Sequence, residues 1–263
     1  MNRYSLPLSF IVVMTVISCG KHDAPVTLAF ERRSLTLDYG DCASDTSSCC
    51  RIGLEWPLLV NGTPAAADSV NGFSVGFVLS RLSGFIPESR RVAASPESLA
   101  QAFCGEYAAF RARFPDTAQQ WWIEIQGEAV YVGDSAATLR MELSAYPGGA
   151  HPIDDVVYRS FDLKTGRTMR PEDIVTDNAS LAALAEAVFR RVRGLAPDAD
   201  LEESGFWFTD NRFALSDNFG LLGVGVVFYY NYYDIAPRYF GPTEVVLSWD
   251  DLDGILAPGF GEK

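Results

Sequence analysis

Short runs in which apolar and polar residues alternate recur along much of the chain. A period of two is typical of strands that bury one face. Turn-forming residues such as Gly133-Asp134-Ser135 and Gly148-Gly149 separate several of these runs, which favours antiparallel hairpins. The predicted strands are residues 26–39, 51–60, 121–132, 138–146, 156–163, 206–208, 212–215, 223–230 and 244–249.

Two other segments repeat apolar residues every three to four positions, the spacing of a helix with one buried face. The first is residues 95–113, where Ser95 suits the N-cap and Pro96 the first helical position. The second is residues 181–192, whereas residues 70–79 fit either a strand or a helix. Many strands joined by short turns, with two helices inserted, predict an α+β fold. In this fold, antiparallel sheets pack against two main helices.

The N-terminal segment has the features of a secretory signal. Arg3 gives it a positive start, and an apolar run at 6–17 is too short for a good membrane-spanning helix. Val16-Ile17-Ser18-Cys19 resembles the lipobox of bacterial lipoproteins, although Val16 stands where leucine is usual. The resemblance implies that residues 1–18 are removed and that Cys19 carries acyl chains such as palmitate. A plain signal peptide with an incidental cysteine is the alternative.

These features predict the location and the organisation of the protein. Residues 19–26 would be a lipidated tether that attaches the protein to a membrane of the bacterial cell envelope. Gly20 follows the cysteine in place of aspartate, so sorting to the outer membrane, facing the periplasm, is expected. The rest is expected to form an N-terminal α+β subdomain at 27–135 and a C-terminal one at 136–263.

Composition and charge exclude several classes of function. With 263 residues, 48% of them hydrophobic, the chain has enough apolar residues for a substantial core and is not a disordered protein. It has 21 basic and 34 acidic residues, a formal charge of −13, which argues against nucleic acid as a partner. Loss of Arg3 with the signal leaves 20 basic and 34 acidic residues, or −14. Two histidines are too few for a typical catalytic zinc site, so no metal or cofactor is expected.

Four cysteines remain after Cys19, an even number that predicts two disulfides in an exported protein. Cys49 and Cys50 are neighbours, and side chains of neighbouring residues in an extended segment point to opposite sides. One of the two is therefore expected to close the short loop to Cys42. The other would reach Cys104 in the first predicted helix.

One motif in the chain suggests nucleophilic catalysis. Residues 72–76, Gly-Phe-Ser-Val-Gly, match the G-x-S-x-G pattern of a nucleophile elbow. The elbow needs a buried strand before it, and residues 65–71 do not suit one. A serine packed among apolar residues is therefore the preferred interpretation of Ser74. The acidic pairs Asp154-Asp155 and Glu172-Asp173 are interpreted as solvated residues beside turns.

Two segments differ from ordinary core patterning and hold the candidate binding residues. In residues 145–152, two glycines would present His151 on a tight loop. In residues 228–237, four tyrosines surround one asparagine, and tyrosines supply rigid contact area with a polar tip. A tyrosine-rich core edge with a satisfied histidine is the alternative. The candidate binding residues are His151, Tyr230, Asn231, Tyr233 and Asp234.

These two segments also carry a family resemblance. Y-x-G-G-A-H followed by F-D-L-x-T-G-R, then Y-N-x-Y-D-I-A-P and G-P-x-E-V, resembles the extracellular domain of RsiV-type anti-sigma factors. The same domain occurs in the non-catalytic N-terminal region of PdaC-type peptidoglycan deacetylases. The matching motifs span residues 146–256, and a weaker match begins near Ile52. The disulfide-bearing segment 41–50 departs from the pattern.

The resemblance implies a non-enzymatic binding module in the cell envelope. RsiV-type domains recognise lysozyme, and the deacetylases act on cell-wall glycan. The expected partner is accordingly a cationic lysozyme-like protein or peptidoglycan. The alternative function is a cell-wall hydrolase or deacetylase that uses His151 and nearby carboxylates.

Overall fold

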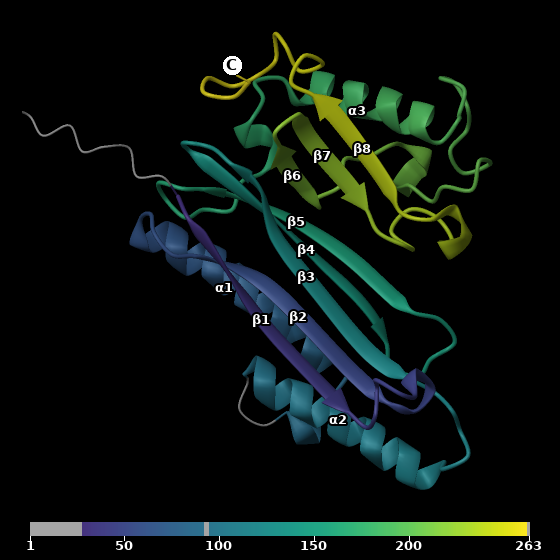
Figure 1. Ribbon diagram of the computed structural model, residues 1–263. Helices are drawn as coiled ribbons and strands as arrows, with labels where there is room; N and C mark the ends of the chain where they lie inside the picture. The colour runs from purple at the N-terminus through teal and green to yellow at the C-terminus, as the bar shows by residue number, and fades with distance from the viewer. Residues whose placement is uncertain (1–27, 92–94, 262–263) are drawn as a thin grey trace, which may run out of the picture.

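The structure, a computed structural model, describes residues 28–91 and 95–261 (Figure 1). Three α-helices and eight strands in these ranges form a mixed α+β fold, which confirms the predicted class. The proposed signal, Cys19 and the tether lie outside the described residues. Within those residues, no helix has the length and apolarity to cross a membrane.

The larger sheet has five strands in the order β1-β2-β3-β4-β5. All neighbours are antiparallel except β2 and β3, which are parallel because two helices connect them in a crossover. The predicted subdomain boundary at 135/136 falls in the β3–β4 hairpin, so both predicted subdomains contribute strands to this sheet. The strands are β1 (Phe30–Tyr39), β2 (Cys50–Leu59), β3 (Trp121–Val132), β4 (Ala136–Tyr146) and β5 (Ile153–Asp162).

Helix α1 (Pro64–Gly84) adds a third helix to the two that the sequence pattern predicts. Thr63 caps it, since its hydroxyl accepts a hydrogen bond from the Ala66 N–H at 3.1 Å. The ambiguous residues 70–79 are therefore helical. Ser74 lies buried in the middle of α1 and donates to the Pro57 carbonyl at 2.7 Å, so it is a packing serine.

Helix α2 (Pro96–Arg113) has the predicted bounds and the predicted cap at Ser95, which forms a capping box with Ser98. Its buried residues include Leu99, Phe103 and Tyr107. Both α1 and α2 cover the same face of the five-stranded sheet, and the ribbon shows them together behind it (Figure 1).

The cysteines lie where β2 meets α2. Cys42 and Cys49 form a disulfide, which identifies the short-loop bridge among the pairings left open by the sequence. Cys50 and Cys104 are buried thiols whose sulfur atoms lie 3.1 Å apart. The structure thus confirms one predicted bridge and brings the remaining two sulfurs into contact without a bond.

We expect Cys50 and Cys104 to be oxidised to a second disulfide when the protein is exported. Such a bridge would tie β2 to α2, and Cys104→Ser should then lower the free energy of unfolding by about 2–4 kcal/mol. Peptide mapping without reduction checks the connectivity, with the Cys42–Cys49 peptide as an internal control. Free Cys50 and Cys104 in protein purified from an oxidising compartment would contradict this prediction.

The smaller sheet has three antiparallel strands, β6 (Phe219–Leu222), β7 (Gly225–Tyr230) and β8 (Thr243–Ser248). Helix α3 (Asn178–Val192) packs on β8, and Asp177 caps it. This C-terminal layer lies on the face of the larger sheet that α1 and α2 leave free (Figure 1). Val156 and Tyr158 of β5 contact Val227 of β7 there.

Two predicted strands, 206–208 and 212–215, are wrong. Both segments lie in loop structure, where their apolar residues pack on α3 instead of pairing with a neighbouring strand. The rings of Phe206, Phe208 and Phe213 surround Phe189 of α3. A buried loop rich in phenylalanine therefore produces the same apolar pattern as a short buried strand.

Candidate functional site: a cleft at the start of β5

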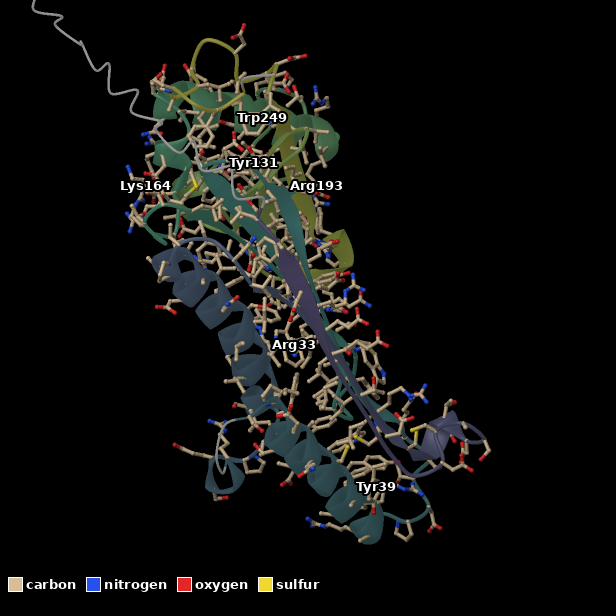
Figure 2. All side chains as sticks on the ribbon, turned by 60° about the vertical axis from the view of Figure 1, so that its left-hand side comes forward. Arg33, Tyr39, Tyr131, Lys164, Arg193 and Trp249 are labelled. Atoms are coloured by element: carbon tan, nitrogen blue, oxygen red, sulfur yellow. A yellow bond between two sulfur atoms is a disulfide. The ribbon has the colours of Figure 1, made fainter. Side chains whose placement is uncertain are left out.

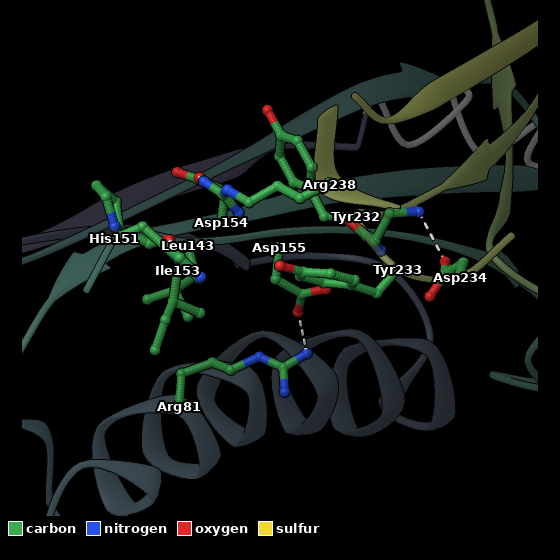
Figure 3. Close-up of a pocket in the computed structure, with 12 residues that line it drawn as sticks. Arg81, Leu143, His151, Ile153, Asp154, Asp155, Tyr232, Tyr233, Asp234 and Arg238 are labelled. Carbon is green, nitrogen blue, oxygen red and sulfur yellow. Dashed lines mark hydrogen bonds and ion pairs between the residues drawn. The ribbon is translucent and has the colours of Figure 1, made fainter. Parts of the chain in front are cut away.

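A cleft of about 340 Å³ opens beside the first residues of β5. It brings together the two segments that the sequence singles out, although about 80 residues separate them along the chain (Figure 3). Helix α1 supplies a third wall through Arg81. The lining residues are Arg81, Leu143, His151, Pro152, Ile153, Asp154, Asp155, Asn231, Tyr232, Tyr233, Asp234 and Arg238.

His151 lies exposed at the cleft on a fixed loop. Gly148 makes this loop possible: its φ is +89°, and a Cβ there would lie 2.5 Å from the indole nitrogen of Trp121. The hydroxyl of Tyr146 donates to the Gly149 carbonyl at 2.7 Å. The imidazole Nδ1 lies 3.0 Å from the Pro152 carbonyl, and among the described residues His151 forms no hydrogen bond or ion pair with an acid.

Asn231 and Asp234 position the second segment. The amide of Asn231 pairs with the backbone of Val156, accepting from its N–H at 2.8 Å and donating to its carbonyl at 2.9 Å. This substitutes for a neighbouring strand at the edge of β5. The carboxylate of Asp234 accepts from the Asn231 N–H at 2.6 Å. Both predicted binding residues therefore line the cleft while their polar atoms hold the turn against the sheet.

The turn brings Tyr233 to the surface and leaves Tyr230 inside. Tyr230 is only 4% exposed, and its hydroxyl donates to the Ala214 carbonyl at 2.6 Å. Burial raises the pKa of this hydroxyl. Contrary to the expectation of a binding role, Tyr230 packs in the core of the C-terminal layer. Tyr233 is 54% exposed and has a φ of +67°, uncommon for a residue with a Cβ.

Two arginine–aspartate pairs flank the cleft. Asp154 accepts from Arg238 at 2.9 Å and from the Ser144 hydroxyl at 2.7 Å, while Asp155 is bonded to Arg81 (Figure 3). Because consecutive residues of a strand face opposite sides, one aspartate meets the C-terminal layer and the other meets α1. The acidic pair is thus ion-paired on a strand and not solvated at a turn.

Burial raises the pKa of Asp155, against the opposing effect of the Arg81 guanidinium. Arg238 also lies over the ring of Tyr232, with its guanidinium carbon 4.3 Å from the ring centre. Nothing in the sequence pattern marks Arg81 or Arg238 as residues of a site, whereas Tyr232 belongs to the tyrosine-rich segment.

The geometry suits ligand binding better than metal chemistry. Both strand carboxylates are held by arginines, and the described residues contain no group of three or more potential metal ligands. The cleft instead offers guanidinium and carboxylate groups beside aromatic faces.

Three exposed aromatic residues on segments beside the cleft, Trp207, Tyr233 and Tyr239, form an aromatic rim. These residues are 50%, 54% and 83% exposed, respectively. The Trp207 indole donates to the Asp234 carbonyl at 3.1 Å, which ties the rim to the turn. Tyr239 immediately follows Arg238 of the cleft. Exposed aromatic side chains of this kind are typical anchors at protein interfaces.

Comparison with known proteins supports the fold without identifying an activity. Residues 172–250 match the family model described as "Protein of unknown function (DUF3298)". No curated protein matches the chain. Among solved structures, a DUF3298 family member from Bacteroides fragilis has a TM-score of 0.59 at 21% identity, over 87% of this chain and 94% of its own. A DUF3298 family protein from Pseudomonas aeruginosa gives 0.55 at 16% identity, over 88% and 95%.

The family match begins after the His151 loop and includes the whole of α3, the small sheet and the 228–237 turn. The two solved structures match 87% and 88% of this chain, so the similarity in fold extends well beyond residues 172–250. The chain therefore contains a region similar to DUF3298 within a fold that DUF3298 proteins share.

Proposed function

We propose that the protein is a lipid-anchored binding module of the bacterial cell envelope, with the cleft and the aromatic rim as its recognition surface. The observation that carries the proposal is the convergence of His151, Tyr232 and Tyr233 with two arginine–aspartate pairs at one edge of the sheet. The lipobox-like sequence before Cys19 supports the anchor. Acyl chains on that cysteine would hold the domain at the membrane.

The proposed partner is a cationic lysozyme-like protein. The formal charge of −13 favours association with a basic protein, because attraction raises the encounter rate. The aromatic rim supplies the desolvated contacts that hold such a complex together. The resemblance to RsiV-type domains points to the same partner, and peptidoglycan glycan is the ligand to test beside it.

Replacing Tyr233 and Tyr239 together with alanine should weaken lysozyme binding about tenfold, equivalent to about 1.4 kcal/mol. Titration calorimetry at low and at physiological salt measures the effect. Higher salt should weaken lysozyme binding by the wild-type protein and by the variant alike. Tyr39→Ala is the matched control. It removes an exposed tyrosine at the end of the molecule opposite Trp249 and the C-terminal layer (Figure 2).

If Tyr39→Ala weakens lysozyme binding as much as the Tyr233/Tyr239 double variant does, the aromatic rim is not the binding surface. Absence of lysozyme binding together with retention on insoluble peptidoglycan would transfer the proposal to the glycan. Absence of both would overturn the proposed function.

One observation favours an enzyme as the second candidate. Burial raises the pKa of Asp155, and a carboxylic acid with a raised pKa beside a cleft can act as a proton donor. In this alternative, the protein is a cell-wall hydrolase or deacetylase that uses His151 and the nearby carboxylates. Turnover of purified peptidoglycan that is lost in His151→Ala would establish it in place of the binding module.

A further inference from the structure

A second and larger hollow lies at the other end of β5. It is a groove of about 1180 Å³ between the end of β5, residues 167–173 and residues 215–219. Leu215 and Phe219 give it an apolar wall. Its charged lining residues are three arginines, Arg159, Arg167 and Arg170, and three acids, Glu172, Asp173 and Asp217. The formal charge of this lining is therefore zero, in a chain whose formal charge is −13.

A short stretch of antiparallel pairing brings residues 167–169 beside the end of β5. Phe161 and Thr168 form an antiparallel bridge, flanked by hydrogen bonds from Asp162 N–H to the Arg167 carbonyl at 2.9 Å and from Met169 N–H to the Ser160 carbonyl at 2.8 Å. Arg159 directly precedes the paired residues of β5 and Arg170 directly follows those of the partner segment, so both arginines lie next to this bridge and line the groove.

Direct ion pairing in the groove involves Arg167, although the charge of Asp173 also acts on Arg170. Asp173 forms a two-pronged ion pair with Arg167, at 2.7 and 2.8 Å. Among the residues that the structure describes, Arg159 and Arg170 have no ion pair. The guanidinium carbon of Arg159 instead lies 5.5 Å from the centre of the Phe73 ring. The groove also contains Glu172 and Asp217, both exposed and neither ion-paired with the two arginines.

We propose that this groove is a binding site for a phosphate monoester, held by Arg159 and Arg170. Guanidinium groups match phosphate oxygens in two-pronged hydrogen bonds, and a phosphate monoester carries close to two negative charges at neutral pH. One such group balances the charge of both arginines. The groove is large enough for the rest of the ligand to lie along the apolar wall of Leu215 and Phe219. The site is separate from the cleft at the start of β5 and does not depend on its proposed function.

Calorimetric titration of the full chain with inorganic phosphate at neutral pH tests the site. We expect Arg159→Gln with Arg170→Gln to weaken phosphate binding at least tenfold. Glu172→Gln with Asp217→Asn should strengthen it, because both changes remove negative charge from the groove. The matched control is Arg113→Gln with Arg191→Gln, which removes two exposed arginines outside the groove and should change binding less than twofold.

Binding to lipid vesicles distinguishes two sources of a phosphate monoester, a lipid headgroup and a soluble ester. Extra retention on phosphatidylcholine vesicles that contain phosphatidic acid, lost in the Arg159/Arg170 variant, would assign the site to a lipid headgroup. Phosphate binding without this extra retention would assign it to a soluble ester. Wild-type protein that binds neither probe, or an equal loss in the control variant, would overturn the proposal.

Discussion

Phe189→Ala is expected to lower the free energy of unfolding by about 3–5 kcal/mol, the largest effect of any single substitution considered for this protein. Phe189 is fully buried in α3, and four aromatic rings contact it. Truncation would leave a cavity that these rigid rings cannot easily fill. Their centroids lie 5.1 to 6.3 Å from that of Phe189, in Phe206, Phe208, Phe213 and Tyr230.

Urea denaturation followed by circular dichroism measures this effect. Val192→Ala is the control, since Val192 lies three residues further along α3 with 52% of its surface exposed, and its truncation should cost under about 0.5 kcal/mol. Similar losses in the two variants would show that the aromatic cluster is not the centre of the C-terminal core. Loss of lysozyme binding by folded Phe189→Ala protein would indicate that the cluster also supports the aromatic rim.

Arg193→Ala has the second largest expected effect, a loss of about 3 kcal/mol. The guanidinium of Arg193, just after α3, donates to the carbonyls of Phe240, Gly241 and Pro242 at 2.9, 3.2 and 2.9 Å. It also donates through Nε to the hydroxyl of the buried Thr243 at 3.0 Å. Removing the side chain leaves these acceptors without their donor, and an unsatisfied buried acceptor costs about 1–3 kcal/mol.

Arg191→Ala provides a close control for this prediction. Arg191 has the same side chain two residues earlier, where it is exposed and has no ion pair among the described residues. Its replacement should change the free energy of unfolding by under about 0.5 kcal/mol. Thermal unfolding of both variants compares them directly, and equal melting temperatures would contradict the role assigned to Arg193.

Features that depend on interactions between neighbouring residues could be predicted from the amino-acid sequence. The Ser95–Pro96 start of α2 follows from capping chemistry within four residues. The β3–β4 hairpin follows from alternation on both sides of a turn at Gly133-Asp134-Ser135. The bridge between Cys42 and Cys49 was among the predicted pairings because the loop between them is short. Each of these signals acts over a short stretch of chain, so no knowledge of distant contacts is needed.

Other features could not be predicted, because their apolar pattern fits more than one structure and long-range contacts select between them. Residues 70–79 are helical because α1 packs on the five-stranded sheet, and their pattern alone suits a strand equally well. Residues 206–215 are apolar because they pack on Phe189, not because they pair in a sheet. Tyr230 and Tyr233 have the same side chain. β7 ends at Tyr230, which is buried, whereas Tyr233 lies in the turn that follows and is exposed.

In the candidate site, the residues that local sequence signals predict differ clearly from those that tertiary contacts add. The sequence identified both segments that meet in the cleft, because glycines beside a histidine and a run of tyrosines are local signals. It did not identify the arginines that hold Asp154 and Asp155, which are 84 and 74 residues distant along the chain. An ion pair over such a distance exists only because the fold brings α1 and the turn after β7 to opposite faces of β5. Local chemistry therefore determined which residues are unusual, while packing of the two layers decided what they contact.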